Sequence, residues 1–118
     1  MNTEERILEY KLKKLSDFAL GDPKSLEVIL VSFLKTGKEN MALFRQYLDE
    51  KNAMAISGLS HKMLPLFRQL EVKPIVEILD RLAHEDRAKL DDRQFFLLAG
   101  TVQKWINKLL LHIEKHEM

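Results

Sequence analysis

The chain has 118 residues, a formal net charge of +1 at pH 7 and no cysteine. The absence of cysteine excludes disulfides, thiol catalysis and thiolate metal sites, and the balanced charge gives no electrostatic case for binding nucleic acid or a membrane surface. The length suits one domain, expected over residues 1–118, and no apolar run approaches the roughly 20 residues that span a membrane. We therefore expect a single domain. The lack of cysteine fits a reducing compartment, we expect the location to be cytoplasmic, and the isolated domain is expected to be monomeric.

The N-terminal segment has the apolar spacing of one amphipathic helix. We predict this helix over residues 4–19, ended by Gly21. Because it precedes the longer helices, we expect it to pack across them as an additional element. Its expected inner face consists of Ile7, Leu8, Leu12, Leu15 and Phe18.

A second, longer helix is predicted over residues 23–49. Asp22 supplies an N-cap, and Pro23 suits the first helical position, where its missing N–H is not needed. The apolar spacing passes through Gly37 in register, which favours one helix, with room for a bend at that glycine, over two shorter ones. The expected inner positions are Leu26, Ile29, Leu30, Phe33, Met41, Phe44 and Leu48.

The third predicted helix, residues 53–70, carries a histidine on its polar side. At about 100° per residue, His61 lies roughly 170° from the centre of the apolar stripe. We therefore expect the imidazole of His61 to be exposed to solvent near the middle of a helix. The apolar stripe recurs every three or four residues, at Ile56, Leu59, Met63, Phe67 and Leu70.

Two further helices are predicted in the C-terminal half. Lys73-Pro74 opens the first of them, which fades at His84 and is followed by a polar connection. Asp91 and Gln94 have the spacing of a capping box, which starts a final helix over residues 92–115. No period-two segment of useful length indicates a strand. The expected fold is therefore all-α, an up-and-down antiparallel four-helix bundle with an additional N-terminal helix.

Small and charged residues surround His61 along its helix. Ser57 and Gly58, one turn before it, would allow a partner to approach closely, and Gly58 costs about 1 kcal/mol relative to alanine in a helix interior. Lys62 and Arg68 would place positive charge near a group held at the histidine. The alternative interpretation makes these residues neutral surface positions and ordinary solvated charges.

Two residues one turn after His61 also have two interpretations. Leu64 is the best exposed apolar candidate for docking a partner, but it lies only about 110° from the core stripe and could pack against the flank. Pro65 has no N–H for the carbonyl of His61 and crowds that carbonyl, which predicts a local bend with or without a functional role.

Other chemically notable residues attract simpler interpretations. His112 and His116 are spaced i, i+4 and could bind a metal ion, but no third ligand completes the site, and no metal or cofactor is predicted. His84 is expected to be exposed in the polar connection. Met54, like the other helical methionines, is interpreted as a gap filler.

The pattern Leu59-Ser60-His61-x-Met63, followed by Leu70, resembles a histidine-containing phosphotransfer domain. The resemblance extends from about Tyr10 to Leu110, so it covers most of the chain. The family usually has lysine three residues after the histidine and a small residue after that, where this chain has Leu64 and Pro65. In this form the chain looks like the C-terminal domain of large bacterial hybrid sensor histidine kinases.

The resemblance implies a role in a phosphorelay. His61 would accept a phosphoryl group from an aspartate of a response-regulator receiver domain and donate it onward, with Mg²⁺ on the receiver and no cofactor on this chain. No glycine-rich phosphate loop indicates an ATP-dependent kinase activity of its own. The alternative function is a non-catalytic helical adaptor that docks a partner through the His61 face. A metal-binding bundle would need inward-facing histidines and carboxylates, which the pattern does not indicate.

Overall fold

Helices are the regular secondary structure in the part of the chain that the structure describes. A computed structural model describes residues 2–84 and 89–118. Within these residues there are six helices and no strand. The helices are α1 (Thr3–Arg6), α2 (Lys13–Phe18), α3 (Pro23–Asp49), α4 (Ala53–Gln69), α5 (Lys73–Ala83) and α7 (Asp92–Glu117).

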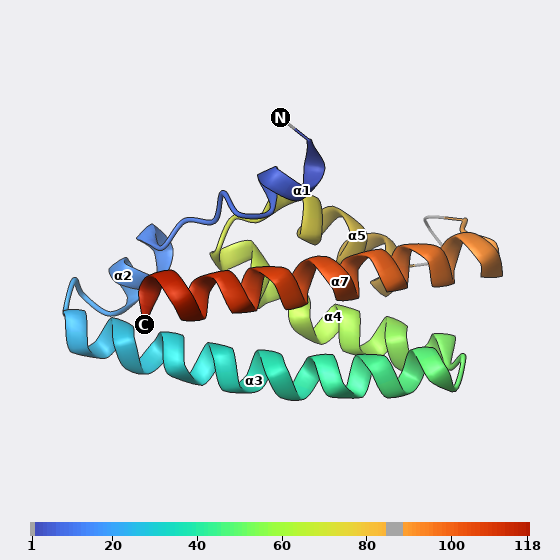
Figure 1. Ribbon diagram of the computed structural model, residues 1–118, viewed down its shortest axis with the longest axis horizontal. Coiled ribbons are helices and arrows are strands. Elements are labelled where there is room, and N and C mark those ends of the chain that lie inside the picture. The colour runs from blue at the N-terminus through green and yellow to red at the C-terminus, as the bar shows by residue number, and fades with distance from the viewer. Residues whose placement is uncertain (1, 85–88) are drawn as a thin grey trace.

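The four longer helices enclose one apolar core. Helix α3 contacts α4 and α7, while α5 contacts the same two helices from the other side. Figure 1 shows α3 and α7 side by side and running in opposite directions, with α4 and α5 behind them. The fully buried side chains come from all four of these helices, and Ile7 of the N-terminal segment joins the same cluster. The predicted all-α fold class is confirmed.

Helix α3 has the bounds that its sequence predicts. Asp22 is its N-cap, and the side chain accepts a hydrogen bond from the backbone N–H of Ser25. Gly37 is buried inside this helix, and a Cβ placed there would lie 2.8 Å from Cδ2 of Leu110 on α7. Because glycine has no Cβ, α7 can approach α3 closely at this point. The helix is continuous through Gly37.

The predicted starts of α5 and α7 also agree with the structure. Asp91 caps α7 through the predicted capping box, in which its side chain accepts from the backbone of Gln94 and the Gln94 side chain accepts from the backbone of Asp91. Helix α5 begins at Lys73 and ends before His84. Of the predicted polar connection, residues 84–90, the part from 85 to 88 lies outside the described residues.

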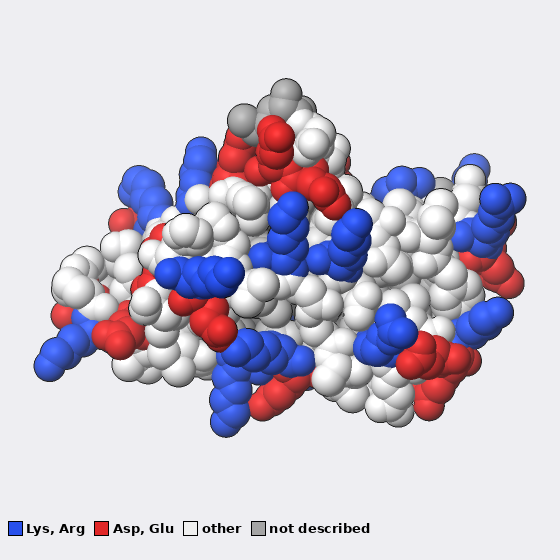
Figure 2. All heavy atoms as spheres, in the orientation of Figure 1, with Lys and Arg blue, Asp and Glu red and all other residues white. Residues whose placement is uncertain are grey.

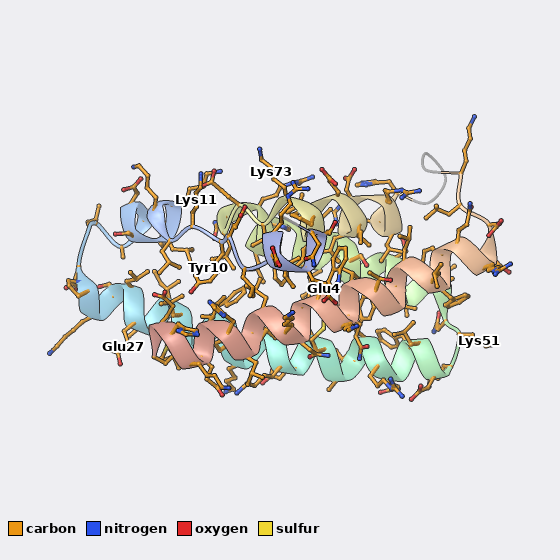
Figure 3. The ribbon with its side chains drawn as sticks, turned by 45° about the horizontal axis from the view of Figure 1, so that its top comes forward. Glu4, Tyr10, Lys11, Glu27, Lys51 and Lys73 are labelled. Carbon is orange, nitrogen blue, oxygen red and sulfur yellow. The ribbon has the colours of Figure 1, made fainter. Side chains whose placement is uncertain are left out.

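The prediction of one N-terminal helix over residues 4–19 is wrong. The chain forms two short helices, α1 and α2, joined by a non-helical segment in which Tyr10 and Lys11 lie (Figure 3). Tertiary contacts hold this segment: the N–H of Lys11 donates to the carbonyl of Leu70 at the end of α4, and the Tyr10 hydroxyl donates to Glu117. A short isolated helix is marginal in water, so these longer-range bonds prevail. Phe18, expected on the inner face, is 77% exposed.

A test for membrane-spanning helices is negative. Among the described residues, no helix combines the length and the apolar composition that crossing a bilayer requires.

Candidate functional site

His61 is exposed near the middle of α4, as its helical position predicts. The buried residues of α4 cover an arc of the helix that is wider than the predicted stripe: Ile56, Leu59, Ser60, Met63, Leu64 and Phe67. At about 100° per residue, this arc spans roughly 140°, and His61 lies about 60° beyond its edge. The imidazole therefore stands at the border between the core and the open face of the helix.

The expectation that Leu64 is an exposed docking residue is wrong. Its side chain is 2% exposed and belongs to the core cluster. Helix α4 packs most extensively against α5, and Leu64 lies about 20° from Ser57 and 40° from Arg68 on the helical wheel. Both of those residues contact α5. Helix α5 therefore covers a flank of α4 that the apolar stripe of α4 alone predicts to be exposed.

Ser57 links the middle of α4 to the last turn of α5. Its hydroxyl donates a hydrogen bond to the carbonyl oxygen of Ala83, with 3.3 Å between the two oxygens. Ser57 is half-buried, so its position suits this structural contact. The neighbouring serine, Ser60, is fully buried, and its hydroxyl has no hydrogen-bond partner within the described structure.

The structure brings a second histidine to His61. His84 follows directly on Ala83, and its ring meets that of His61 at a centroid distance of 5.7 Å and an interplanar angle of 72°. The side chain of His84 is 27% exposed and partly buried, so the expectation of an exposed loop residue is wrong. Sequence reasoning missed this residue because the two histidines are 23 positions apart, one within α4 and the other directly after the end of α5. The one sequence signal was its place at the end of the helix that follows α4.

Asp80 of α5 contacts both His84 and, across to α4, Arg68. Nδ1 of His84 lies 3.1 Å from the backbone oxygen of Asp80 and 3.2 Å from its Oδ1. The same Oδ1 lies 3.6 Å from the guanidinium of Arg68. Arg68 therefore lies where α4 meets α5. Its ion pair with Asp80 is exposed and of modest strength. Lys62 is exposed on the other side of His61.

The open face of α4 is formed by residues on the far side from the core. Gly58 and Pro65 are exposed there, and a Cβ added to Gly58 would meet no atom within 4 Å. Met54 is 85% exposed on the same face, two turns before His61, so its interpretation as a gap filler is wrong. Helix α4 continues through Pro65, which provides no N–H to the carbonyl of His61.

The other two histidines lie together near the end of α7. The rings of His112 and His116 are 4.2 Å apart, and Tyr10 contacts His112 edge to face. Burial, and then the charge of His116, lower the pKa of His112. Burial, followed by the hydrogen bond and charge of Glu117, raises the pKa of Tyr10 to about 12. Within residues 2–84 and 89–118, no three histidine or acidic side chains are arranged to hold a metal ion.

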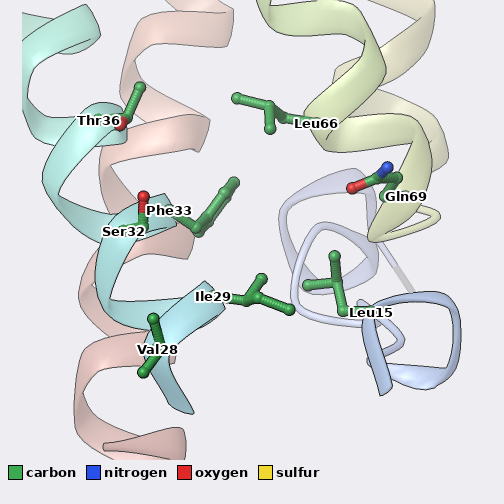
Figure 4. A pocket seen from close by; sticks show the side chains of 8 residues that line it. All are labelled: Leu15, Val28, Ile29, Ser32, Phe33, Thr36, Leu66 and Gln69. Carbon is green, nitrogen blue, oxygen red and sulfur yellow. The ribbon is translucent and has the colours of Figure 1, made fainter. Parts of the chain in front are cut away.

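An apolar pocket of about 350 Å³ lies between α2, α3 and α4. Figure 4 shows Phe33 and Ile29 of α3 pointing into it from one side, with Leu66 and Gln69 of α4 and Leu15 of α2 on the opposite side. The lining contains no histidine, lysine or acidic side chain, so it offers no general acid or base to activate its two hydroxyl groups. The remaining lining residues are Val28, Ser32 and Thr36.

Charges of both signs are distributed over the surface. In Figure 2, acidic side chains gather over α1, and side chains of both signs are spread across the rest of that face. Glu4 of α1 pairs with Lys104 and Lys108 of α7 at 3.4 and 3.8 Å. These pairs hold α1 to α7.

Comparisons of this chain with models of protein families, with curated proteins and with solved structures find no match. The geometry of the His61 site therefore has to be interpreted by its own chemistry.

Proposed function

We propose that this chain is a phosphotransfer domain in which His61 carries a phosphoryl group between receiver domains. The observation that carries the proposal is an exposed imidazole, held near the middle of a helix at the edge of a packed core. Helices α3, α4, α5 and α7, each in contact with at least two of the others, are interpreted as an up-and-down four-helix bundle, with α1 and α2 as the N-terminal addition.

The chemistry needs one nucleophilic nitrogen that a partner can reach. A neutral imidazole nitrogen of His61 attacks the phosphorus of an aspartyl phosphate; the N–P bond forms as the P–O bond to the aspartate breaks, and the carboxylate leaves. The reverse step returns the phosphoryl group to a second aspartate. The receiver supplies Mg²⁺, which neutralises charge on the transferred group. A rigid helix suits this role because it fixes the direction of attack.

The receiver is proposed to dock on the open face of α4. Met54, Gly58 and Pro65 flank His61 there, and all three are exposed. The space above Gly58 lets a partner backbone approach the helix, and Met54 offers an adaptable apolar contact. Leu64, which is buried, takes no part in this surface.

The proposal is tested with receiver domains that carry labelled phosphate on their aspartates. After incubation with this chain, the label should appear on the chain as acid-labile, base-stable phosphate. In His61→Gln the label should be absent, while His116→Gln, the same change at an exposed histidine of α7, should accept it as the wild type does. Label that persists in His61→Gln, or that moves to another histidine, contradicts the assignment of His61.

The alternative function, a non-catalytic adaptor, gives a different result in the same experiment. A receiver would then bind the chain through the His61 face, but no label would transfer. Titration measures binding of the receiver, and the labelling assay measures transfer of the phosphoryl group. Run side by side, the two measurements separate the two functions.

A further inference from the structure

The orientation of His84 is set by two acceptors from one residue. Nδ1 of its ring lies 3.1 Å from the backbone oxygen and 3.2 Å from Oδ1 of Asp80. A backbone carbonyl and an ionised carboxylate can only accept, so Nδ1 carries a hydrogen and donates it. The other ring nitrogen, Nε2, remains for a different group.

The ring of His84 is also in direct contact with the proposed nucleophile. The edge-to-face arrangement with His61, at a centroid distance of 5.7 Å, leaves no space for another side chain between the rings. The charged or titratable side chains with described contacts in this cluster are Asp80 from α5 and His61 and Arg68 from α4. The Ser57–Ala83 hydrogen bond fixes the end of α5 from which His84 projects.

We infer that His84 is a second histidine of the phosphoryl site, whose Nε2 binds the oxygens of a phosphoryl group held on His61. The inference rests on the proposed function of His61. With Nδ1–H given to Asp80, a neutral His84 has only a lone pair at Nε2. When the phosphoryl oxygens arrive, the ring takes a proton from solvent and donates it from Nε2, while Asp80 stabilises the resulting cation.

This contact acts where the charge of the reaction develops. The oxygens of the transferring phosphoryl group carry most of its negative charge, and a donor already in place there lowers the barrier without reorganisation. Lysine at the position of Leu64 would place its positive charge on α4 itself. Here the donor comes from the end of α5, on the other side of the α4–α5 edge.

The experiment uses phosphoramidate, so that no receiver has to be identified. The imidazole of His61 attacks its phosphorus, the N–P bond to the histidine forms, and the original P–N bond breaks to release ammonia. Phosphohistidine is followed by ³¹P NMR and located by mass spectrometry. His84→Ala should form phospho-His61 about tenfold more slowly, a loss of about 1.4 kcal/mol in transition-state stabilisation.

Conservative variants separate contact with the phosphoryl group from a structural effect. His84→Gln keeps an N–H donor near the position of Nε2 and should recover most of the rate. Asp80→Asn should slow the reaction, whereas Glu77→Gln, the matched change at an exposed acidic residue of the same helix, should not. The imidazole ¹⁵N signals of His84 should move to the protonated range when His61 becomes phosphorylated, a change that a purely structural role would not produce.

Each outcome decides between the two proposals. If the wild type takes up phosphate at His61 and His84→Ala does so at the same rate, the role of His84 is wrong and that of His61 stands. Unchanged ¹⁵N signals of His84 after phosphorylation would overturn its role as well. If neither phosphoramidate nor a phosphorylated receiver labels His61, the proposed function fails and this inference fails with it.

Discussion

The hydroxyl of Ser57 donates a hydrogen bond to the carbonyl oxygen of Ala83, and this bond joins the middle of α4 to the last turn of α5. The residue after Ala83 is His84, which contacts His61, the residue one turn after Ser57. Ser57 and His61 of α4 thus contact two consecutive residues, the last residue of α5 and the one that follows it. A serine that looked like a small surface residue therefore helps to place the second imidazole.

Replacing Ser57 by alanine should lower the stability, whereas the same change at Ser60 should not. Ser57→Ala removes a partly buried hydrogen bond and should lower the free energy of unfolding by about 0.5–1.5 kcal/mol. Ser60→Ala removes a buried hydroxyl without a described partner, so stability should stay the same or rise. Urea unfolding of both variants provides the measurement. Equal destabilisation by the two changes would show that the hydroxyl of Ser60 makes a bond in solution.

Truncation of Leu64 should lower the free energy of unfolding about as much as truncation of Phe67, which the sequence already places in the core. Leu64→Ala should lower the free energy of unfolding by about 2–5 kcal/mol, and Phe67→Ala by about 3–5 kcal/mol, because both leave a cavity. Leu66→Ala, at a half-buried position of the same helix, serves as the control and should cost less. Wild-type stability of Leu64→Ala would show that this side chain is exposed in solution.

Gly58→Ala should separate folding from binding. The added Cβ meets nothing within 4 Å, so helix propensity should raise the free energy of unfolding by about 0.5–1 kcal/mol. If a receiver approaches α4 closely at this position, the same change should weaken its binding and slow labelling of His61. Thermal unfolding and receiver titration measure the two effects. A higher free energy of unfolding with unchanged receiver affinity would show that the docking contact lies elsewhere.

The stability of the fold should fall with rising pH above about 10, partly because of Tyr10. Its pKa is raised to about 12 in the folded chain, so between pH 10 and 12 the unfolded chain loses a proton that the folded chain keeps. The stabilisation is complete below pH 10 and is lost as the pH rises through this range. Tyr10→Phe should flatten this part of the stability curve, measured by urea unfolding at several pH values.

Glu117→Gln tests which interaction holds the proton on Tyr10. Burial is the largest cause of the raised pKa, and the hydrogen bond and charge of Glu117 add to it. The amide can still accept the phenol hydrogen, but the negative charge is gone. The fall in stability should therefore become smaller without disappearing, and a profile identical to the wild type would show that Glu117 has no effect.

Local signals in the sequence were sufficient for the four longer helices. Asp22 before Pro23, the Asp91–Gln94 capping box and the Lys73-Pro74 start each satisfy or avoid backbone N–H groups within a few residues. The exposure of His61 also followed from its angle to the apolar stripe of its own helix. Such features depend on neighbours three or four residues away, which the sequence states directly.

The tertiary structure alone decided the features that depend on a second helix. Leu64 is buried because α5 covers the flank of α4, and the segment around Lys11 leaves the helical path because its N–H bonds to Leu70. His84 reaches His61 because α5 packs against α4 in one particular register. Burial and long-range hydrogen bonds depend on which surfaces meet, and that is a property of the packed helices together, which the periodicity of each helix alone does not specify.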